Sequence, residues 1–163
     1  MTGMRPPAIR VVAGAPGSGK STAVAACLAM QAPLIFLDMD WLLDASGALA
    51  GTDIRFASKT WPAYNRLWSE VLAALARNHN TPVLFAPGML DGVPAENHVH
   101  LDCAAPVRRE RLAARRWDQN RMAEALEDAA ELRRDIPGTP LDSARLSPNQ
   151  IAARIIAWAT PPA

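Results

Sequence analysis

The stretch Gly14-Ala15-Pro16-Gly17-Ser18-Gly19-Lys20-Ser21 carries the strongest signal in this sequence. It matches the phosphate-binding pattern G-x-x-x-x-G-K-[ST] at every fixed position. Residues 9–13, which precede it, are β-branched and apolar, as is typical of a buried parallel strand. Residues 21–31, which follow it, are rich in alanine and predict a helix. A loop of this composition between a strand and a helix predicts a binding site for phosphate groups.

The residue types of this loop have physical roles in holding phosphate. Glycines let the backbone turn tightly and bring several N–H groups onto one anion, and the following helix points its positive dipole end at the same place. Lys20 is placed to reach the β- and γ-phosphates of a nucleoside triphosphate, and the Ser21 hydroxyl is a ligand for Mg²⁺. We therefore predict that the residues from Gly14 to Thr22 bind ATP with Mg²⁺. The alternative is a glycine-rich turn followed by a helix-capping serine.

The composition is that of an ordinary soluble protein. The chain has 163 residues, 50% hydrophobic and 20% charged, and this length is typical of one domain, so we expect a single domain over residues 1–163. The net charge of +1 provides no overall field to attract nucleic acid or a membrane, and we expect neither as a partner. Cys27 and Cys103 are expected to be free buried thiols. Together with a start that lacks the apolar core of a signal peptide, this indicates a cytoplasmic protein.

Predicted strands and helices alternate along the chain. Besides residues 9–13, strands are predicted at 34–37, 83–86, 99–102 and 141–142. Besides residues 21–31, helices are predicted at 41–50, 61–78, 107–117, 120–134 and 148–158, the last capped by Ser147. Residues 1–8 are expected to form an irregular lead-in. The alternation predicts an α/β fold, in which helices cover both faces of a parallel sheet.

Two carboxylates follow the second predicted strand. Asp38 and Asp40 come directly after residues 34–37, at the end of the strand where open α/β sheets bind ligands. One such carboxylate can hold Mg²⁺ or its water, while the other accepts a proton from an attacking hydroxyl. The alternative is that one or both cap the helix predicted from Trp41.

The segment Phe36-Leu37-Asp38-Met39-Asp40 behind a phosphate loop resembles the F-x-D-x-D segment of shikimate kinases and the F-L-D-x-D segment of gluconate kinases, which are small P-loop kinases. The resemblance implies a three-layer P-loop fold with a five-stranded parallel sheet in the order 2-3-1-4-5, and the number of predicted strands agrees. It also implies that Asp38 helps to organise Mg²⁺, and that Asp40 contacts the acceptor hydroxyl and is the candidate base.

The arginine-rich segment 108–116 supports the same resemblance. The residues Arg111-Leu112-Ala113-Ala114-Arg115 are similar to the R-L-x-x-R segment in the lid of small P-loop kinases. This implies that Arg111 and Arg115 close over ATP and neutralise charge on the transferring phosphoryl group, a task that suits the forked guanidinium. We favour Arg115 as the catalytic arginine and expect a helical lid around residues 105–135. Most other arginines of the segment are expected on a solvated helix face.

The resemblance extends to the end of the chain but differs at the acceptor loop. Residues 141–143 and 146–148 look like the fifth strand and following helix of small kinase-like ATP-binding proteins, where this loop lies against adenine. Residues 86–89 replace the glycine-rich acceptor loop of shikimate kinases, so we expect an acceptor other than shikimate. No predicted strand ends in the Asp-Glu pair of motor ATPases, which weighs against mechanical ATP hydrolysis.

Together these features predict a kinase that moves the γ-phosphoryl group of MgATP to a hydroxyl of a small molecule. Lys20, Asp40 and Arg115 are the predicted catalytic residues, and Ser21 and Asp38 the predicted metal ligands. Candidate acceptors are a nucleoside, a sugar acid, or an antibiotic hydroxyl as in chloramphenicol phosphotransferases. Two alternatives stay open: a nucleoside monophosphate kinase, because nucleotide kinases share the lid arginines, and an ATP-binding switch protein that is not a kinase.

Several other side chains are weaker candidates. His98 and His100 share one face of a predicted strand, but two ligands do not make a metal site. Trp41 either stacks on an acceptor ring or packs in the core. Three basic residues are candidates for the wall of an acceptor pocket: Arg55, Lys59 and Arg66.

Overall fold

The computed structural model describes residues 8–160, and within them five strands form one parallel sheet. The strands are β1 (Arg10–Ala13), β2 (Ile35–Asp38), β3 (Pro82–Ala86), β4 (His98–Asp102) and β5 (Leu141–Asp142). Their order across the sheet is β2-β3-β1-β4-β5, with every neighbouring pair parallel. The predicted number and order of strands are confirmed. The predicted lead-in lies outside the described residues except for Ala8.

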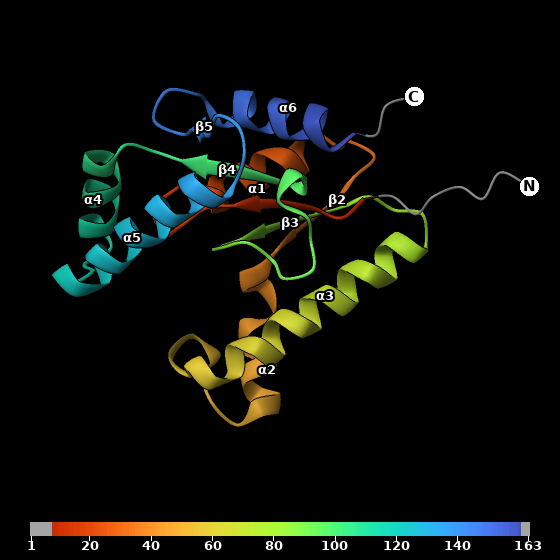
Figure 1. The fold of residues 1–163 in the computed structure, drawn as a ribbon, viewed down its shortest axis with the longest axis horizontal. Helices are drawn as coiled ribbons and strands as arrows, with labels where there is room; N and C mark the ends of the chain where they lie inside the picture. The colour runs from red at the N-terminus through yellow and green to blue at the C-terminus, as the bar shows by residue number, and fades with distance from the viewer. Residues whose placement is uncertain (1–7, 161–163) are drawn as a thin grey trace, which may run out of the picture.

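Helices pack on both faces of the sheet, so the fold has three layers (Figure 1). The α-helices are α1 (Lys20–Ala29), α2 (Leu43–Ala50), α3 (Trp61–Arg77), α4 (Ala105–Ala114), α5 (Gln119–Asp135) and α6 (Pro148–Ala159). Short 3-10 turns lie at Met39–Leu42, Ile54–Phe56, Ser58–Thr60 and Ala95–Asn97. None of the helices in the described part of the chain is both long and apolar enough to cross a membrane.

The central strands are apolar on both faces because each face meets its own helical layer. Side chains alternate across a strand, so neighbours in sequence join different cores. On β1, Val11 packs in the core with α3 and the C-terminal half of α5, whereas Val12 packs in the core with α1 and α6. On β3, Leu84 and Phe85 divide in the same way. The continuous apolar runs in the sequence are a consequence of this burial from both sides.

The parallel register brings the strand ends to one edge of the sheet. Ala13 at the end of β1 pairs with Ala86 of β3, and Asp38 of β2 pairs with Phe85. On the other side Asp102 of β4 pairs with Asp142 of β5. The loops that leave these strands therefore begin next to one another, which is the arrangement that builds ligand sites in open α/β sheets.

Two predicted helices differ from the structure near this edge. The helix predicted at 41–50 begins instead as a 3-10 turn at Met39, because the Asp38 carboxylate accepts a hydrogen bond from the Asp40 N–H at 2.9 Å and caps the turn. The helix predicted at 107–117 is α4, which starts two residues earlier and ends at Ala114. Just beyond its end, Arg116 has a φ of 58°, a left-handed conformation that does not continue a helix.

Candidate active site

The predicted phosphate loop joins β1 to α1 at the carboxyl edge of the sheet. Gly17 and Gly19 have φ values of 81° and 95°, a region that glycine enters far more readily than other residues. A Cβ atom on Gly14 would lie 2.5 Å from Ser18 Oγ and 2.8 Å from the carbonyl oxygen of Leu101. The backbone of the loop is therefore packed against β4 too closely for a side chain at Gly14.

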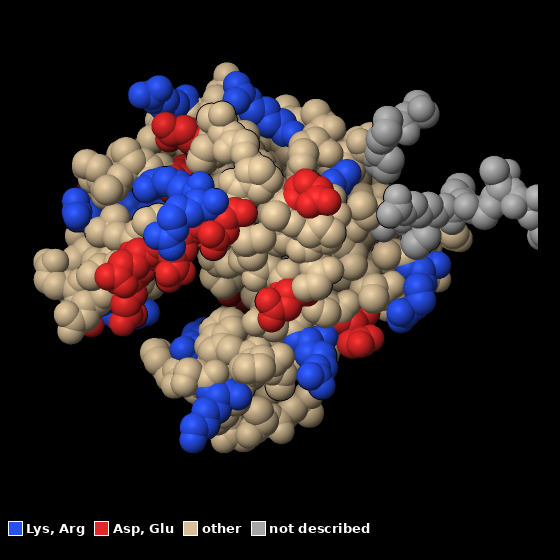
Figure 2. Space-filling model, in the orientation of Figure 1, with Lys and Arg blue, Asp and Glu red and all other residues tan. Residues whose placement is uncertain are grey.

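A cleft of about 380 Å³ opens in front of the loop. In Figure 2 a hollow separates the part of the molecule built by α2 and the start of α3 from the part built by α4 and α5. The lining comes from both parts and from the loop: Pro16, Gly17, Ser18, Gly19, Lys20, Ser21, Asp40, Leu43, Arg55, Phe56, Trp61, Pro87, Arg115, Trp117 and Arg121. The predicted catalytic residues Lys20, Asp40 and Arg115 thus lie around one cavity, although they come from three separate elements.

A second hollow of about 250 Å³ lies between α1 and the loop that joins β5 to α6. Predicted nucleotide-binding residues in its lining include Thr22, Arg111 and Arg115. The full lining consists of Gly19, Thr22, Ala23, Arg111, Arg115, Ser143, Leu146, Pro148 and Ile151. Arg115 and Gly19 border both cavities, so the two hollows are adjacent. The loop that joins β5 to α6 is the one for which the sequence resemblance implies contact with adenine.

The other predicted site residues lie behind the cleft. Gly14 and Ala15 are buried, and the Gly14 carbonyl accepts a hydrogen bond from Lys20 Nζ at 2.5 Å. Asp38 is buried and caps the 3-10 turn that begins at Met39, whereas the alternative interpretation expected a cap on a helix from Trp41. Its role toward Mg²⁺ stays a prediction. The Tyr64 hydroxyl of α3 donates a hydrogen bond to the Met39 carbonyl and so holds the segment between the two aspartates in place.

Burial shapes the electrostatics of the loop lysine. It lowers the pKa of Lys20 to about 8, although the charges of Asp40 and Asp38 act in the opposite direction. Burial also raises the pKa of Asp38, an effect that the hydrogen bond from the Asp40 backbone partly offsets. The Lys20 ammonium group is therefore less well solvated than a surface lysine, and a phosphate beside it would stabilise its charge.

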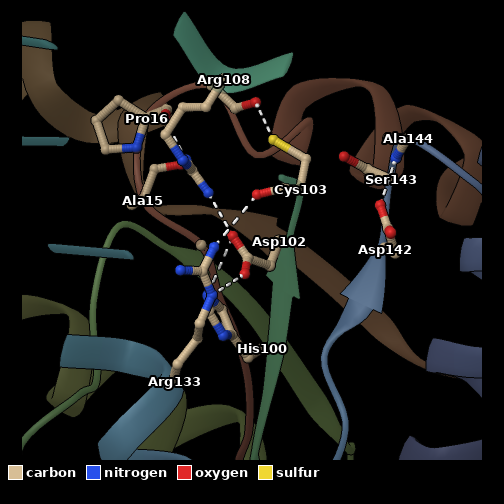
Figure 3. Close-up of polar contacts among 12 residues, drawn as sticks. Ala15, Pro16, His100, Asp102, Cys103, Arg108, Arg133, Asp142, Ser143 and Ala144 are labelled. Atoms are coloured by element: carbon tan, nitrogen blue, oxygen red, sulfur yellow. Dashed lines mark hydrogen bonds and ion pairs between the residues drawn. The ribbon is translucent and has the colours of Figure 1, made fainter. Parts of the chain in front are cut away.

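An arginine that the sequence analysis assigned to no site holds the phosphate loop. Arg108 of α4 is fully buried, and its guanidinium donates to the carbonyls of Ala15, at 3.1 Å, and Pro16. Its other end donates to Asp102 Oδ1 at 2.5 Å. Figure 3 shows the side chain reaching from α4 to the loop on one side and to Asp102 on the other. Arg108 is an exception to the expectation that most arginines of this segment lie on a solvated face. The available signal was spacing, because Arg108 lies four residues before the buried Leu112.

Arg111 holds the next peptide of the loop. It donates from Nη1 to the Gly17 carbonyl at 3.0 Å and to Ser143 Oγ at 2.8 Å, and from Nη2 to the Ser143 carbonyl at 3.1 Å. The two arginines thus draw three consecutive carbonyls of the loop toward α4. In a trans peptide the N–H points opposite to the C=O, so the Gly17 N–H is directed away from Arg108.

Asp102 is the centre of this network, which we call the Asp102 cluster (Asp102, Arg108 and Arg133). Arg133 of α5 donates from Nε to Asp102 Oδ2 at 2.6 Å, so the carboxylate binds one arginine through each oxygen (Figure 3). Burial favours the neutral carboxyl, but the hydrogen bonds from Arg133 and from the Cys103 backbone outweigh it and hold the pKa of Asp102 below its ordinary value of 3.8. The cluster ties α4, α5 and the phosphate loop to the end of β4.

Acid is expected to remove the stability that ionised Asp102 contributes. Because the pKa of Asp102 is lowered on folding, this contribution is complete above about pH 4 and is lost as the pH falls through the folded-state pKa. The difference in unfolding free energy between the parent and Asp102→Asn, measured by urea titration, should be large at pH 7 and shrink at lower pH. Asp135→Asn, which changes an exposed carboxyl of α5, should give a small difference throughout. A difference for Asp102→Asn that is independent of pH would contradict the prediction.

The weaker candidates divide between the cleft and the core. Arg55 lines the cleft, whereas Lys59 and Arg66 are not among its lining residues, and Trp41 is exposed outside it. His98 accepts a hydrogen bond from the Leu90 N–H at Nε2 and pairs Nδ1 with the Pro94 carbonyl, so it anchors the segment before β4. Within residues 8–160 no three His, Cys, Asp or Glu side chains are grouped to hold a metal ion. Cys27 and Cys103 are buried free thiols, as predicted.

Comparison with solved structures finds the same fold. Solved structures with the same fold include an unliganded sugar kinase from Janibacter sp., with 24% identity over 94% of both chains and a TM-score of 0.63. The tunicamycin resistance protein of Deinococcus radiodurans has 20% identity over 96% of this chain and 99% of its own, with a TM-score of 0.68. The shikimate kinase of Acinetobacter baumannii, solved with shikimate, has 15% identity over 93% and 92%, with a TM-score of 0.61. These likenesses show the shared fold.

The sequence itself gives the family. No curated protein sequence matches the chain. The profile of the shikimate kinase family matches residues 16–159, which include the phosphate loop from Pro16 onward, both aspartates and the arginines of α4. The protein therefore belongs to the shikimate kinase family and is a P-loop kinase.

Proposed function

We propose that the protein transfers the γ-phosphoryl group of ATP to a hydroxyl group of a small molecule. The observation that carries this proposal is the convergence of Lys20, Asp40 and Arg115 on one open cleft. A phosphoryl donor on the loop and an acceptor beside Asp40 would meet there in a fixed orientation, and such positioning is the main source of catalysis in phosphoryl transfer.

The two adjacent hollows suggest how the nucleotide lies. Its phosphates would bind at the N-terminus of α1, where backbone N–H groups and the helix dipole favour anions. The base would extend into the hollow beside Ser143, and Arg111 and Arg115 would lie along the phosphates between the two cavities. We further propose that residues 1–163 act as one domain, with the arginine-rich region 105–135 as its lid. Of that region, Arg115, Trp117 and Arg121 border the cleft.

The available oxygen donors suit Mg²⁺, which prefers oxygen ligands and few protein contacts. The Ser21 hydroxyl borders the cleft, and the Asp38 carboxylate lies at the end of β2, where its charge and that of Asp40 act on Lys20. We propose Ser21 and Asp38 as the residues that hold the ion. When bound, it would supply positive charge to the β- and γ-phosphate oxygens.

The remaining chemistry is assigned to this chain's side chains. The acceptor oxygen forms a bond to the γ-phosphorus while the bond from that phosphorus to the β–γ bridging oxygen breaks, so ADP leaves. The proton of the acceptor hydroxyl passes to the Asp40 carboxylate. Lys20 and Arg115 neutralise the charge that develops on the transferring group and on ADP.

Asp40→Asn tests the proposed base. Because the amide keeps the shape of the carboxylate but cannot take the proton, we expect kcat to fall about 100- to 10,000-fold while the Kd for ATP stays within about twofold. ADP release in the presence of an acceptor measures the first quantity, and calorimetry with a non-hydrolysable ATP analogue measures the second. Asp91→Asn, an exposed carboxylate outside the cleft, is the matched control. Transfer by Asp40→Asn at the parental rate would refute the assignment.

A further inference from the structure

The part of the cleft beyond the phosphate loop is lined by aromatic side chains from both of its walls. Phe56 belongs to the segment that leads into α3, Trp61 is the first residue of α3, and Trp117 lies between α4 and α5. Leu43 and Pro87 add further apolar surface. A volume of about 380 Å³ for the whole cleft is within the range of sites that hold small organic ligands.

Phe56 is unusual in its exposure at this position. Its side chain is 80% exposed although it borders a cavity whose other aromatic residues are partly covered. Single exposed apolar side chains are common on protein surfaces, and Trp41 is one of them. Phe56 differs because it faces the cleft together with Trp61 and Trp117, so an apolar ligand would cover it. Covering such a ring removes a large apolar area from water.

Two of the basic residues around this outer part, Arg55 and Arg121, already contact other side chains. Arg55 Nη1 lies 2.8 Å from Asp44 Oδ1 and 3.5 Å from Asp53 Oδ1, so two carboxylates balance its charge. The guanidinium of Arg121 lies over the ring of Trp117, 4.0 Å from its centroid, and steadies the indole by a cation–π contact. An anionic acceptor would have to compete with Asp44 and Asp53 for Arg55, whereas an uncharged ring needs no such exchange.

We propose that the phosphoryl acceptor is a hydroxyl compound with an uncharged aromatic ring. The ring lies among Phe56, Trp61 and Trp117, and the hydroxyl lies beside Asp40. This inference rests on the proposed function and narrows it, because it favours nucleosides and aromatic alcohols over sugar acids and nucleoside monophosphates.

Matched acceptors test the proposal on the purified full chain. The uncharged aromatic compounds are adenosine, uridine and 1-phenyl-1,3-propanediol, and the anionic ones are AMP, UMP, shikimate and gluconate. ADP release gives kcat/KM for each, and mass spectrometry identifies the phosphorylated product. We expect the best uncharged aromatic acceptor to exceed every anionic one by at least tenfold in kcat/KM. A preference for shikimate or gluconate would overturn the inference and leave the proposed transfer to a hydroxyl group standing. A preference for a monophosphate, with the new phosphate found on its phosphate group, would overturn both the inference and the hydroxyl as acceptor.

Substitutions of Phe56 test the contact itself. Phe56→Ala should raise KM for the best aromatic acceptor about tenfold and leave KM for ATP within twofold, whereas Phe56→Tyr should restore the acceptor KM because it restores the ring. Trp41→Ala removes an exposed aromatic residue outside the cleft and should change neither constant. An unchanged acceptor KM in Phe56→Ala would refute the contact. If no compound in either group accepts phosphate while the protein binds ATP, the proposed function fails, and the inference fails with it.

Discussion

Lys20→Ala is expected to lower kcat for phosphoryl transfer by about 1000-fold, because it removes a charged donor from a partly enclosed site where electrostatic stabilisation is strong. The same substitution should not destabilise the protein in the absence of nucleotide. Burial lowers the pKa of Lys20 to about 8, which means that its charge is unfavourable in the folded state at neutral pH. The expected signature is therefore a protein that unfolds no more easily than the parent but gains little stability from MgATP.

Steady-state ADP release and thermal unfolding with and without MgATP measure the two effects. The chain has one other lysine, the exposed Lys59, which is outside the cleft, so Lys59→Ala is a matched control for loss of a lysine. Its kcat and its stabilisation by MgATP should equal those of the parent. If Lys20→Ala kept more than about a tenth of the parental kcat, or the full stabilisation by MgATP, Lys20 would not be the phosphate-binding lysine.

Arg108→Ala is expected to lower the free energy of unfolding by about 3–5 kcal/mol, because removing one partner of a buried ion pair leaves the other charge poorly compensated. Asp102 would keep Arg133 but lose the hydrogen bond at Oδ1, and the carbonyls of Ala15 and Pro16 would lose their donor. KM for ATP should rise as well, because those carbonyls orient the phosphate loop. Arg108 is in this sense a positioning residue rather than a catalytic one.

Urea unfolding measures the stability change, and Arg109→Ala is the control. Arg109 is the next residue of α4 and is exposed, so its replacement should change stability by less than about 0.5 kcal/mol. Arg108→Lys retains the charge, but the lysine ammonium group lacks the fork with which the guanidinium contacts the loop and Asp102 at the same time. We therefore expect a loss of unfolding free energy between those of the other two variants. Equal stabilities for Arg108→Ala and Arg109→Ala would show that the Asp102 cluster does not hold the fold together.

Much of the fold could be predicted because its signals are local. The buried strands are continuous apolar runs, and the phosphate loop is a single contiguous stretch whose glycines are needed by the backbone of that stretch. The strand order came from the resemblance carried by residues 36–40, and the register of β1, β2 and β3 agrees with it. The start of the helix after β2 was misplaced, because the choice between an α-helix and a 3-10 turn depends on how the Asp38 side chain caps the backbone.

The candidate site could be predicted only where its residues follow the loop or the strand ends. Lys20 and Asp40 were identified in this way, and both line the cleft. Arg108 was missed because its contacts with Ala15 and Pro16 join residues more than 90 positions apart, and a charged residue is expected at the surface unless such partners are known. Phe56 was missed because it lies near no recognisable motif, and Trp117 was missed because the arginine-rich segment before it does not indicate that its side chain borders the cleft.

The sequence by itself determined that this chain has a phosphate loop between a strand and a helix, followed by a pair of aspartates, because each of these features needs only residues close together in the chain. The tertiary structure decided which of several arginines is buried against that loop and which aromatic residues surround the space in front of it. Those properties depend on the packing of α4 and α5 beside β4 and of α3 on the other side of the cleft. Contacts between segments so far apart in the chain leave no local pattern to read.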